Sequence, residues 1–184
     1  MDERREAPAP RFEAAVETHR AAVLAYARRR LEPDLAEDVA AETFAIAWRR
    51  REEMPREALL WLYAIARGVV SNHRRSEARR LRLAARLAQE RGAGDEDPAG
   101  LVADRLELAH AFDALEDSDR ELLMLVAWEG LAPRQGARVL GCSAAAFRVR
   151  VHRARKRLEQ GLVRAPAAPV GERGAEQVSA VKES

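Results

Sequence analysis

The sequence predicts an all-α protein made of two small helical domains joined by a flexible linker, and three observations predict this fold class. The 184 residues are enough for one medium or two small domains. Apolar residues make up 47% of the chain but aromatic residues only 5%, so Ala, Leu and Val dominate, which favours helices over sheets. Residues 88–100 combine three glycines, a proline and several acids, a composition typical of a linker.

The first domain is predicted over residues 11–87 as three helices. They span residues 11–31, 35–51 and 56–87. Pro33 should end the first helix, and Asp34 can cap the second, because its carboxylate can accept hydrogen bonds from the free N–H groups at a helix start. The third helix begins apolar and ends rich in arginine, and we expect a break in it near residues 71–73.

The second domain is predicted over residues 101–162. Ser118 with Glu121 forms a capping box just before an apolar run, which predicts the start of a helix. Pro133 suits the first turn of the next, short helix, and Gly141 suits the left-handed conformation that ends it.

The last predicted helix has the clearest pattern in the chain, and Ser143 can cap its start. Four apolar residues spaced by 4, 3 and 4 form one narrow stripe. They are Phe147, Val151, Ala154 and Leu158. The opposite side is basic, so the short helix, the glycine turn and this helix together predict a helix-turn-helix. Residues 163–184 show no periodicity and are predicted to be disordered.

Charge is unevenly distributed, although the net charge is only +2. Residues 67–91 hold eight arginines against two acids, and residues 130–158 hold seven arginines and one lysine with no acid. An acidic stretch separates these two basic blocks. Local basic blocks attract phosphate whatever the total charge, so the distribution indicates a nucleic-acid partner.

The sequence argues against several other classes of protein. Cys142 is the only cysteine, and no Cys/His cluster suggests a metal site. A Gly-rich phosphate loop, a carboxylate pair and a nucleophile motif are lacking, so neither an enzyme nor a cofactor is expected. The start of the chain lacks the apolar core of a signal peptide, and no apolar run is long enough to span a membrane, so we expect a cytoplasmic protein. We expect Cys142, Trp48 and Trp61 to be core residues.

Three segments together carry a resemblance to a known family. They are AEDVAAETFAIAWRR (residues 36–50), WLYAIARGVVSNHRR (residues 61–75) and EGLAPRQGARVLGCSAAAFRVRVHRARKRL (residues 129–158). In this order they resemble the core-binding helix, the −10 segment and the −35 helix-turn-helix of extracytoplasmic-function (ECF) sigma factors. The resemblance covers about residues 11–162. It implies a factor that joins RNA polymerase core and directs it to particular promoters.

The resemblance also implies roles for individual residues. Asp38 and Glu42 would face the clamp helices of the largest polymerase subunit. Residues implied at the −10 element are Asn72, His73, Arg74, Arg75 and Arg79. Residues implied at the −35 element are Ser143, Arg148, Val149, His152 and Arg153. Asn72 falls where the family binds a flipped base, whose edge an amide can both donate to and accept from. An anti-sigma factor that blocks both surfaces is a further expected partner.

The chain departs from the family pattern at several positions. Gly136 replaces a usual apolar residue, which should weaken its helix by up to about 1 kcal/mol. Val149 and residues 144–146 replace more polar residues near the start of the recognition helix, which leaves the promoter sequence open. Two rival functions also stay open: a helix-turn-helix regulator that does not engage core polymerase, and an interaction adaptor with a degenerate sigma fold. Taken alone, Asp38 and Glu42 would be an ordinary solvated helix face.

Overall fold

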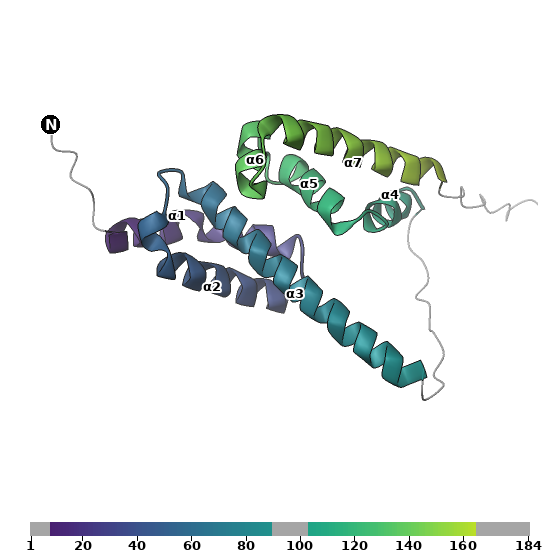
Figure 1. The fold of residues 1–184 in the computed structure, drawn as a ribbon, viewed down its shortest axis with the longest axis horizontal. Helices are drawn as coiled ribbons and strands as arrows, with labels where there is room; N and C mark the ends of the chain where they lie inside the picture. The colour runs from purple at the N-terminus through teal and green to yellow at the C-terminus, as the bar shows by residue number, and fades with distance from the viewer. Residues whose placement is uncertain (1–7, 90–102, 165–184) are drawn as a thin grey trace, which may run out of the picture.

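The computed structural model describes residues 8–89 and 103–164, and within these ranges it contains helices and no strand (Figure 1). The first domain consists of α1 (Pro8–Arg28), α2 (Pro33–Arg49), the short 3-10 helix η1 (Arg51–Glu53) and α3 (Ala58–Gln89). The second consists of α4 (Ala103–Asp113), α5 (Asp117–Ala127), α6 (Pro133–Leu140) and α7 (Ala144–Arg164). The predicted all-α fold class is confirmed.

The ends of two helices differ from the expected domain limits. Helix α3 continues to Gln89, so the first two residues of the predicted linker are helical, while its residues 90–100 lie outside the described ranges. Helix α7 continues to Arg164, and the rest of the predicted tail lies outside the described ranges as well. Gly161 lies inside α7 and packs against α4: a Cβ added to it would lie 3.3 Å from the Cβ of Ala111.

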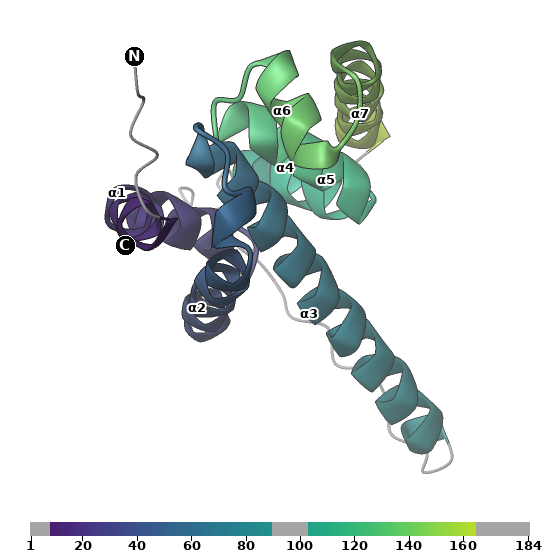
Figure 2. The same cartoon turned by 60° about the vertical axis from the view of Figure 1, so that its left-hand side comes forward.

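The core of the first domain forms where α1, α2 and α3 pack on one another. Its largest fully buried apolar side chains are Val23, Tyr26, Val39, Leu62 and Val69. The Tyr26 ring stacks on the ring of Tyr63, with 5.1 Å between their centroids. Beyond this core, the second half of α3 extends away from α1 and α2 as a single rod (Figure 2).

Two local expectations for the first domain were wrong. Helix α2 starts at Pro33 itself, with Asp34 in its first turn and no side-chain cap, because a proline at the first helical position has no N–H that needs a partner. Helix α3 shows no break at residues 71–73. There the Asn72 side chain accepts a hydrogen bond from Arg75 one turn on, so it does not compete for the backbone.

The core of the second domain confirms the predicted apolar stripe. Phe147, Val151 and Ala154 of α7 are buried and Leu158 is half-buried. Gly136 of α6 faces the Phe147 ring so closely that a Cβ at this position would overlap it. The glycine that departs from the family pattern is therefore needed for close packing between α6 and α7.

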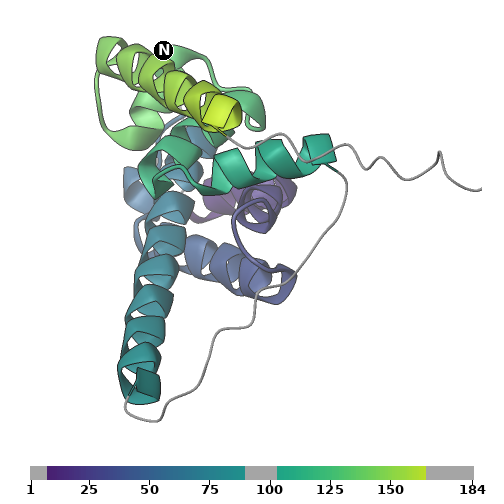
Figure 3. The same ribbon diagram turned by 90° about the vertical axis from the view of Figure 1, so that its right-hand side faces the viewer.

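The two domains pack directly against each other. Helix α6 lies against the first half of α3, and the second domain covers that side of the first (Figures 1 and 3). One continuous cluster of buried apolar residues includes members from both, among them Val70 on α3 and Val139 on α6. Arg138 on α6 also pairs with Glu57 at the start of α3.

The core predictions for the tryptophans and the cysteine had different outcomes. Trp61 and Cys142, both expected in the core, are half-buried and pack against the apolar cluster from its edge. The prediction for Trp48 was wrong, because its side chain is 42% exposed. It lies near the end of α2, with its ring edge-on to Phe12 at 5.3 Å and the Arg51 guanidinium 4.4 Å from its centroid.

Candidate nucleic-acid interface

Helix α7 is held by a turn that the sequence specifies well. Gly141 adopts a left-handed conformation, with φ of 63°, and ends α6 as predicted. The Ser143 hydroxyl accepts a hydrogen bond from the Ala146 amide at 3.1 Å, which confirms it as the cap of α7. The hydroxyl proton of Ser143 stays available to donate to a phosphate at this helix start.

The outward face of α7 is basic and open to solvent. Arg148, Val149, His152 and Arg153 are all exposed. Val149 is 50% exposed and lies among basic side chains. An exposed apolar side chain at this place can contact the methyl group of a thymine. Within the described residues Arg148 and Arg153 form no ion pair, and their charges are not neutralised by the protein. A helix of this kind, presented by a helix-turn-helix, fits a DNA major groove.

Helix α3 presents a second basic surface on the first domain. Asn72, Arg75 and Arg79 are exposed there, and the Asn72 Oδ1 accepts a hydrogen bond of 2.6 Å from Arg75. His73 and Arg74 are half-buried. All but Arg75 line an open hollow of about 770 Å³ between the α1–α2 turn and α3.

Arg74 is the member of this surface that the second domain engages. Its guanidinium lies 3.3 Å from Asp117 of α5 and donates to the backbone oxygen of Arg30 at 3.1 Å. A basic side chain that was expected to hold DNA phosphate is therefore already bound to a carboxylate in this structure.

The acidic pair Asp38 and Glu42 lies exposed on α2, one turn apart. Glu42 Oε2 lies 3.2 Å from His73 Nε2 on α3. The structure thus places the candidate polymerase surface directly beside the candidate −10 surface.

Two family descriptions match the chain, one in each domain. "Sigma-70 region 2" matches residues 15–80, and "Sigma-70, region 4" matches residues 105–158. The ECF RNA polymerase sigma factor SigL of Mycobacterium tuberculosis is 30% identical over 154 residues, which cover 79% of this chain and 85% of SigL. The chain belongs to the ECF sigma factors.

A second relative and a solved structure are also similar to this chain. A probable RNA polymerase sigma factor of Xanthomonas campestris, RfaY, is 32% identical over 136 residues, which span 70% of this sigma factor but about a third (34%) of RfaY. The solved structure of the sigma factor RpoE in complex with the anti-sigma factor NepR, from Bartonella quintana, has a TM-score of 0.59 and 24% identity. It covers 84% of this chain and 98% of RpoE, and it shows that the fold is shared.

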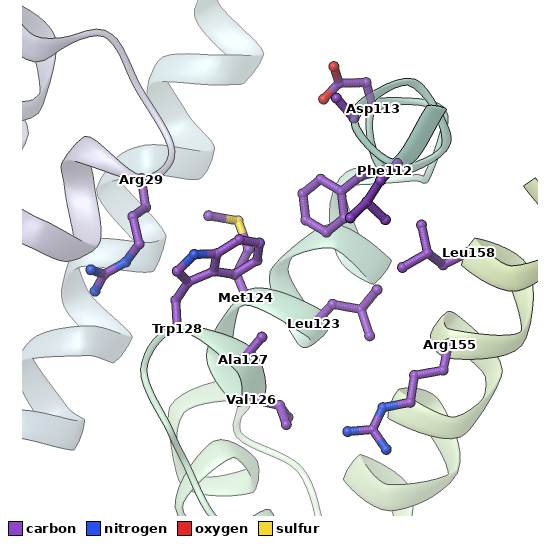
Figure 4. Close-up of a pocket in the computed structure, with 12 residues that line it drawn as sticks. Arg29, Phe112, Asp113, Leu123, Met124, Val126, Ala127, Trp128, Arg155 and Leu158 are labelled. Carbon is purple, nitrogen blue, oxygen red and sulfur yellow. The ribbon is translucent and has the colours of Figure 1, made fainter. Parts of the chain in front are cut away.

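The second domain of this sigma factor also carries an apolar hollow of about 750 Å³ (Figure 4). Its walls come from α4, α5 and α7, with Trp128 at 54% exposure and Phe112 edge-on to it at 5.8 Å. Arg155 lies at its α7 edge, and Arg29 of the first domain lies beside Trp128. Arg155 lies two turns after Arg148 on the same edge of α7, so the hollow adjoins one edge of the basic face.

A buried ionic cluster, which no local sequence pattern predicts, lies between the domains. The cluster consists of Tyr26, Arg29, Arg30, Glu121 and Glu129. Arg30 donates to Glu121 Oε2 at 2.7 Å and to Glu129 Oε1 at 2.8 Å, and the Tyr26 hydroxyl donates to Glu121 Oε1 at 2.7 Å. Arg29 also pairs with Glu129.

This cluster explains why the predicted capping box at Ser118 and Glu121 was wrong. Helix α5 starts at Asp117 without a side-chain cap, because Arg30 and Tyr26 take the Glu121 carboxylate. Burial, together with the negative charge of Glu121, raises the pKa of Tyr26 well above its ordinary value. Burial alone would lower the pKa of Arg30, but its contacts with Tyr26, Glu121 and Glu129 outweigh burial and raise it.

Within the described residues, no group of three or more His, Cys, Asp or Glu side chains is placed to hold a metal ion. None of the helices in residues 8–89 and 103–164 is both long and apolar enough to cross a lipid bilayer.

Proposed function

We propose that this sigma factor starts transcription by joining RNA polymerase core through α2 and binding promoter DNA through α3 and α7. The observation that carries the proposal is the presence of two separate basic helix surfaces, one in each domain, beside one acidic surface. The acidic pair Asp38 and Glu42 suits a basic protein partner, here the clamp helices of the polymerase, and charge complementarity sets the rate and register of such docking.

At the −10 element we propose that Asn72 contacts a base that has left the stack. The hollow of about 770 Å³ beside it has room for a base, and its lining is mixed: four arginines and His73 line it together with Glu32 and Glu77. The Asn72 amide would exchange its bond with Arg75 for bonds to the base edge, and Arg75 would then turn to a phosphate. His73, Arg74 and Arg79 would hold the backbone next to this base.

At the −35 element we propose that Arg148, Val149, His152 and Arg153 enter the major groove. An arginine can bind a guanine with two hydrogen bonds, and Val149 can contact a thymine methyl group. Ser143 would fix the helix start on a phosphate, where the helix dipole adds to the attraction.

A regulatory partner is also part of the proposal. RpoE was solved with the anti-sigma factor NepR bound. We infer that a protein of this class binds the present chain and withholds it from polymerase. The chain would act by binding rather than by catalysis, in the bacterial cytoplasm where polymerase works.

Adding the purified chain to core polymerase on genomic DNA fragments tests the function. Specific runoff transcripts are expected, because the chain would supply promoter recognition that core lacks. Binding to duplex DNA without specific initiation would instead favour a helix-turn-helix regulator. Neither binding nor initiation would favour an interaction adaptor.

A further inference from the structure

The apolar hollow of the second domain exposes large apolar side chains that none of the contacts proposed above uses. Trp128 and Leu108 at this hollow are 54% and 50% exposed. Phe112, Leu123 and Leu158 point toward the space between α4, α5 and α7 (Figure 4). Large contiguous apolar patches on soluble proteins mark binding sites, and a concave patch of this kind suits an apolar ligand.

Two aromatic rings give the hollow a shape that suits one class of ligand. The rings of Phe112 and Trp128 meet edge to face, with 5.8 Å between their centroids and 68° between their planes. Grooves lined by aromatic rings bind proline-rich segments in the polyproline II conformation. The backbone carbonyls of such a segment form no internal hydrogen bonds, so the indole N–H of Trp128 can donate to one of them.

A segment of this composition directly follows α7 in the chain. Residues 165–170 read APAAPV and carry no charged side chain. Pro166 and Pro169 are three residues apart, which is one turn of a polyproline II helix, so in that conformation both rings lie on the same side of the segment. Proline also fixes φ before binding, which lowers the entropy lost when the segment docks.

The end of α7 brings this segment to the hollow. Gly161 packs against Ala111 of α4, so the chain leaves α7 beside one wall of the hollow. Leu158 at the hollow lies six residues before Arg164, the last residue of α7, which is about 9 Å along the helix. Six extended residues span up to about 20 Å, so residues 165–170 can turn back and lie along the hollow.

We propose that the apolar hollow is a binding site for residues 165–170 of the same chain, which dock in it as a polyproline II segment. The two proline rings pack against Phe112 and Trp128. A short tether gives an effective concentration of about 1 mM, so a contact too weak to detect between separate molecules can form within one chain. Residues 165–170 are then ordered, in contrast to the disorder predicted from their lack of periodicity.

Charge favours the same arrangement. Glu172 follows the segment by two residues and comes within reach of Arg155, which is exposed at the α7 edge of the hollow. None of the residues assigned to polymerase or DNA takes part in this contact, so it goes beyond the proposed function.

Nuclear magnetic resonance of the full chain tests the contact without changing the helices. Nuclear Overhauser effects are expected between the two prolines and the indole of Trp128, whose N–H signal is assigned with Trp128→Phe. Pro166→Ser with Pro169→Ser should shift this signal, because the segment leaves the hollow. Val178→Ser with Val181→Ser makes a matched change further along the chain and should leave the signal in place.

A pair of thiols gives an independent test in a Cys142→Ser background. Ala109→Cys lies at the hollow, and Ala168→Cys lies between the two prolines. On mild oxidation these thiols should form a disulfide within one chain. The control pairs Ala168→Cys with Ala14→Cys on an exposed part of α1. The first pair should react about tenfold faster or more, because docking raises the effective concentration of its thiols.

Three results would overturn the proposal. One is an equal rate of disulfide formation in the two thiol pairs. Another is a Trp128 signal that the proline substitutions do not move, with no Overhauser effect from either proline. Disulfides between two chains, in place of those within one chain, would assign the hollow to a second copy of the protein. Runoff transcription tests the proposed function separately, and its outcome does not depend on this contact.

Discussion

The domain interface and the outward face of α7 use the same residue type in opposite ways. Arg30 is fully buried and satisfied by two carboxylates, whereas Arg153 is exposed and forms no ion pair within the described residues. Water screens an exposed charge and leaves it ready for a phosphate or a base, while a buried charge must find its partners inside the protein. Burial, and not residue type, therefore separates the arginines that connect the domains from those offered to DNA.

The largest expected effect comes from removing the buried cation. Arg30→Met leaves Glu121 and Glu129 with Arg29 alone, and breaking a buried pair typically costs about 3–5 kcal/mol. We expect the domains to uncouple and to unfold in separate urea transitions, which circular dichroism follows because both domains are helical. Arg148→Met on the exposed face should change stability by less than about 0.5 kcal/mol. Equal losses of stability in the two variants would show that burial does not separate these two arginines.

Reversing the acidic surface of α2 should have the next largest effect. Asp38→Arg with Glu42→Arg places like charges against a basic partner, which costs several kcal/mol and should abolish co-purification with core polymerase. Circular dichroism should be unchanged, because both side chains are exposed. Glu13→Arg with Glu17→Arg makes the same charge change on an exposed face of α1 and should leave binding intact. Retained binding by the α2 variant would refute the assignment.

Overfilling the contact between α6 and α7 should have a smaller effect. Gly136→Ala gains helix propensity, but its Cβ meets the Phe147 ring, and overpacking costs about 1–3 kcal/mol. We expect a lower melting temperature for the second domain and weaker −35 binding. Adding Phe147→Leu removes the obstructing ring and should recover part of the loss. A stabilised Gly136→Ala variant would show that helix propensity outweighs packing at this site.

The smallest expected effect concerns a single exposed arginine. Arg153→Ala should weaken binding to −35 DNA by about 1–3 kcal/mol if the side chain contacts a base. The loss should be confined to the cognate sequence in a salt-controlled binding titration, because phosphate contacts act on every sequence. Arg20→Ala is the control, since Arg20 is an exposed arginine on α1 of the first domain and not on α7. An equal loss on all sequences would make Arg153 a phosphate contact.

Much of the candidate site could be predicted because it depends on local patterns. The stripe that begins at Phe147 needs only the helical period, and it placed Arg148 and His152 on the exposed side. The prediction was less complete on α3. The exposure of Asn72 follows from the helix, but the engagement of Arg74 by Asp117 joins residues 43 positions apart, and no local spacing reports such a contact.

The sequence by itself determined the helices, the turn at Gly141, the cap at Ser143 and the basic blocks. These depend on side chains three or four residues apart and on backbone freedom at single positions. Only the tertiary structure decided that Glu121 binds Arg30 instead of capping α5, and that Gly136 serves packing against Phe147. Arg30 and Glu121 are 91 residues apart in the chain, and burial, which only the folded chain creates, makes their contact complete and specific.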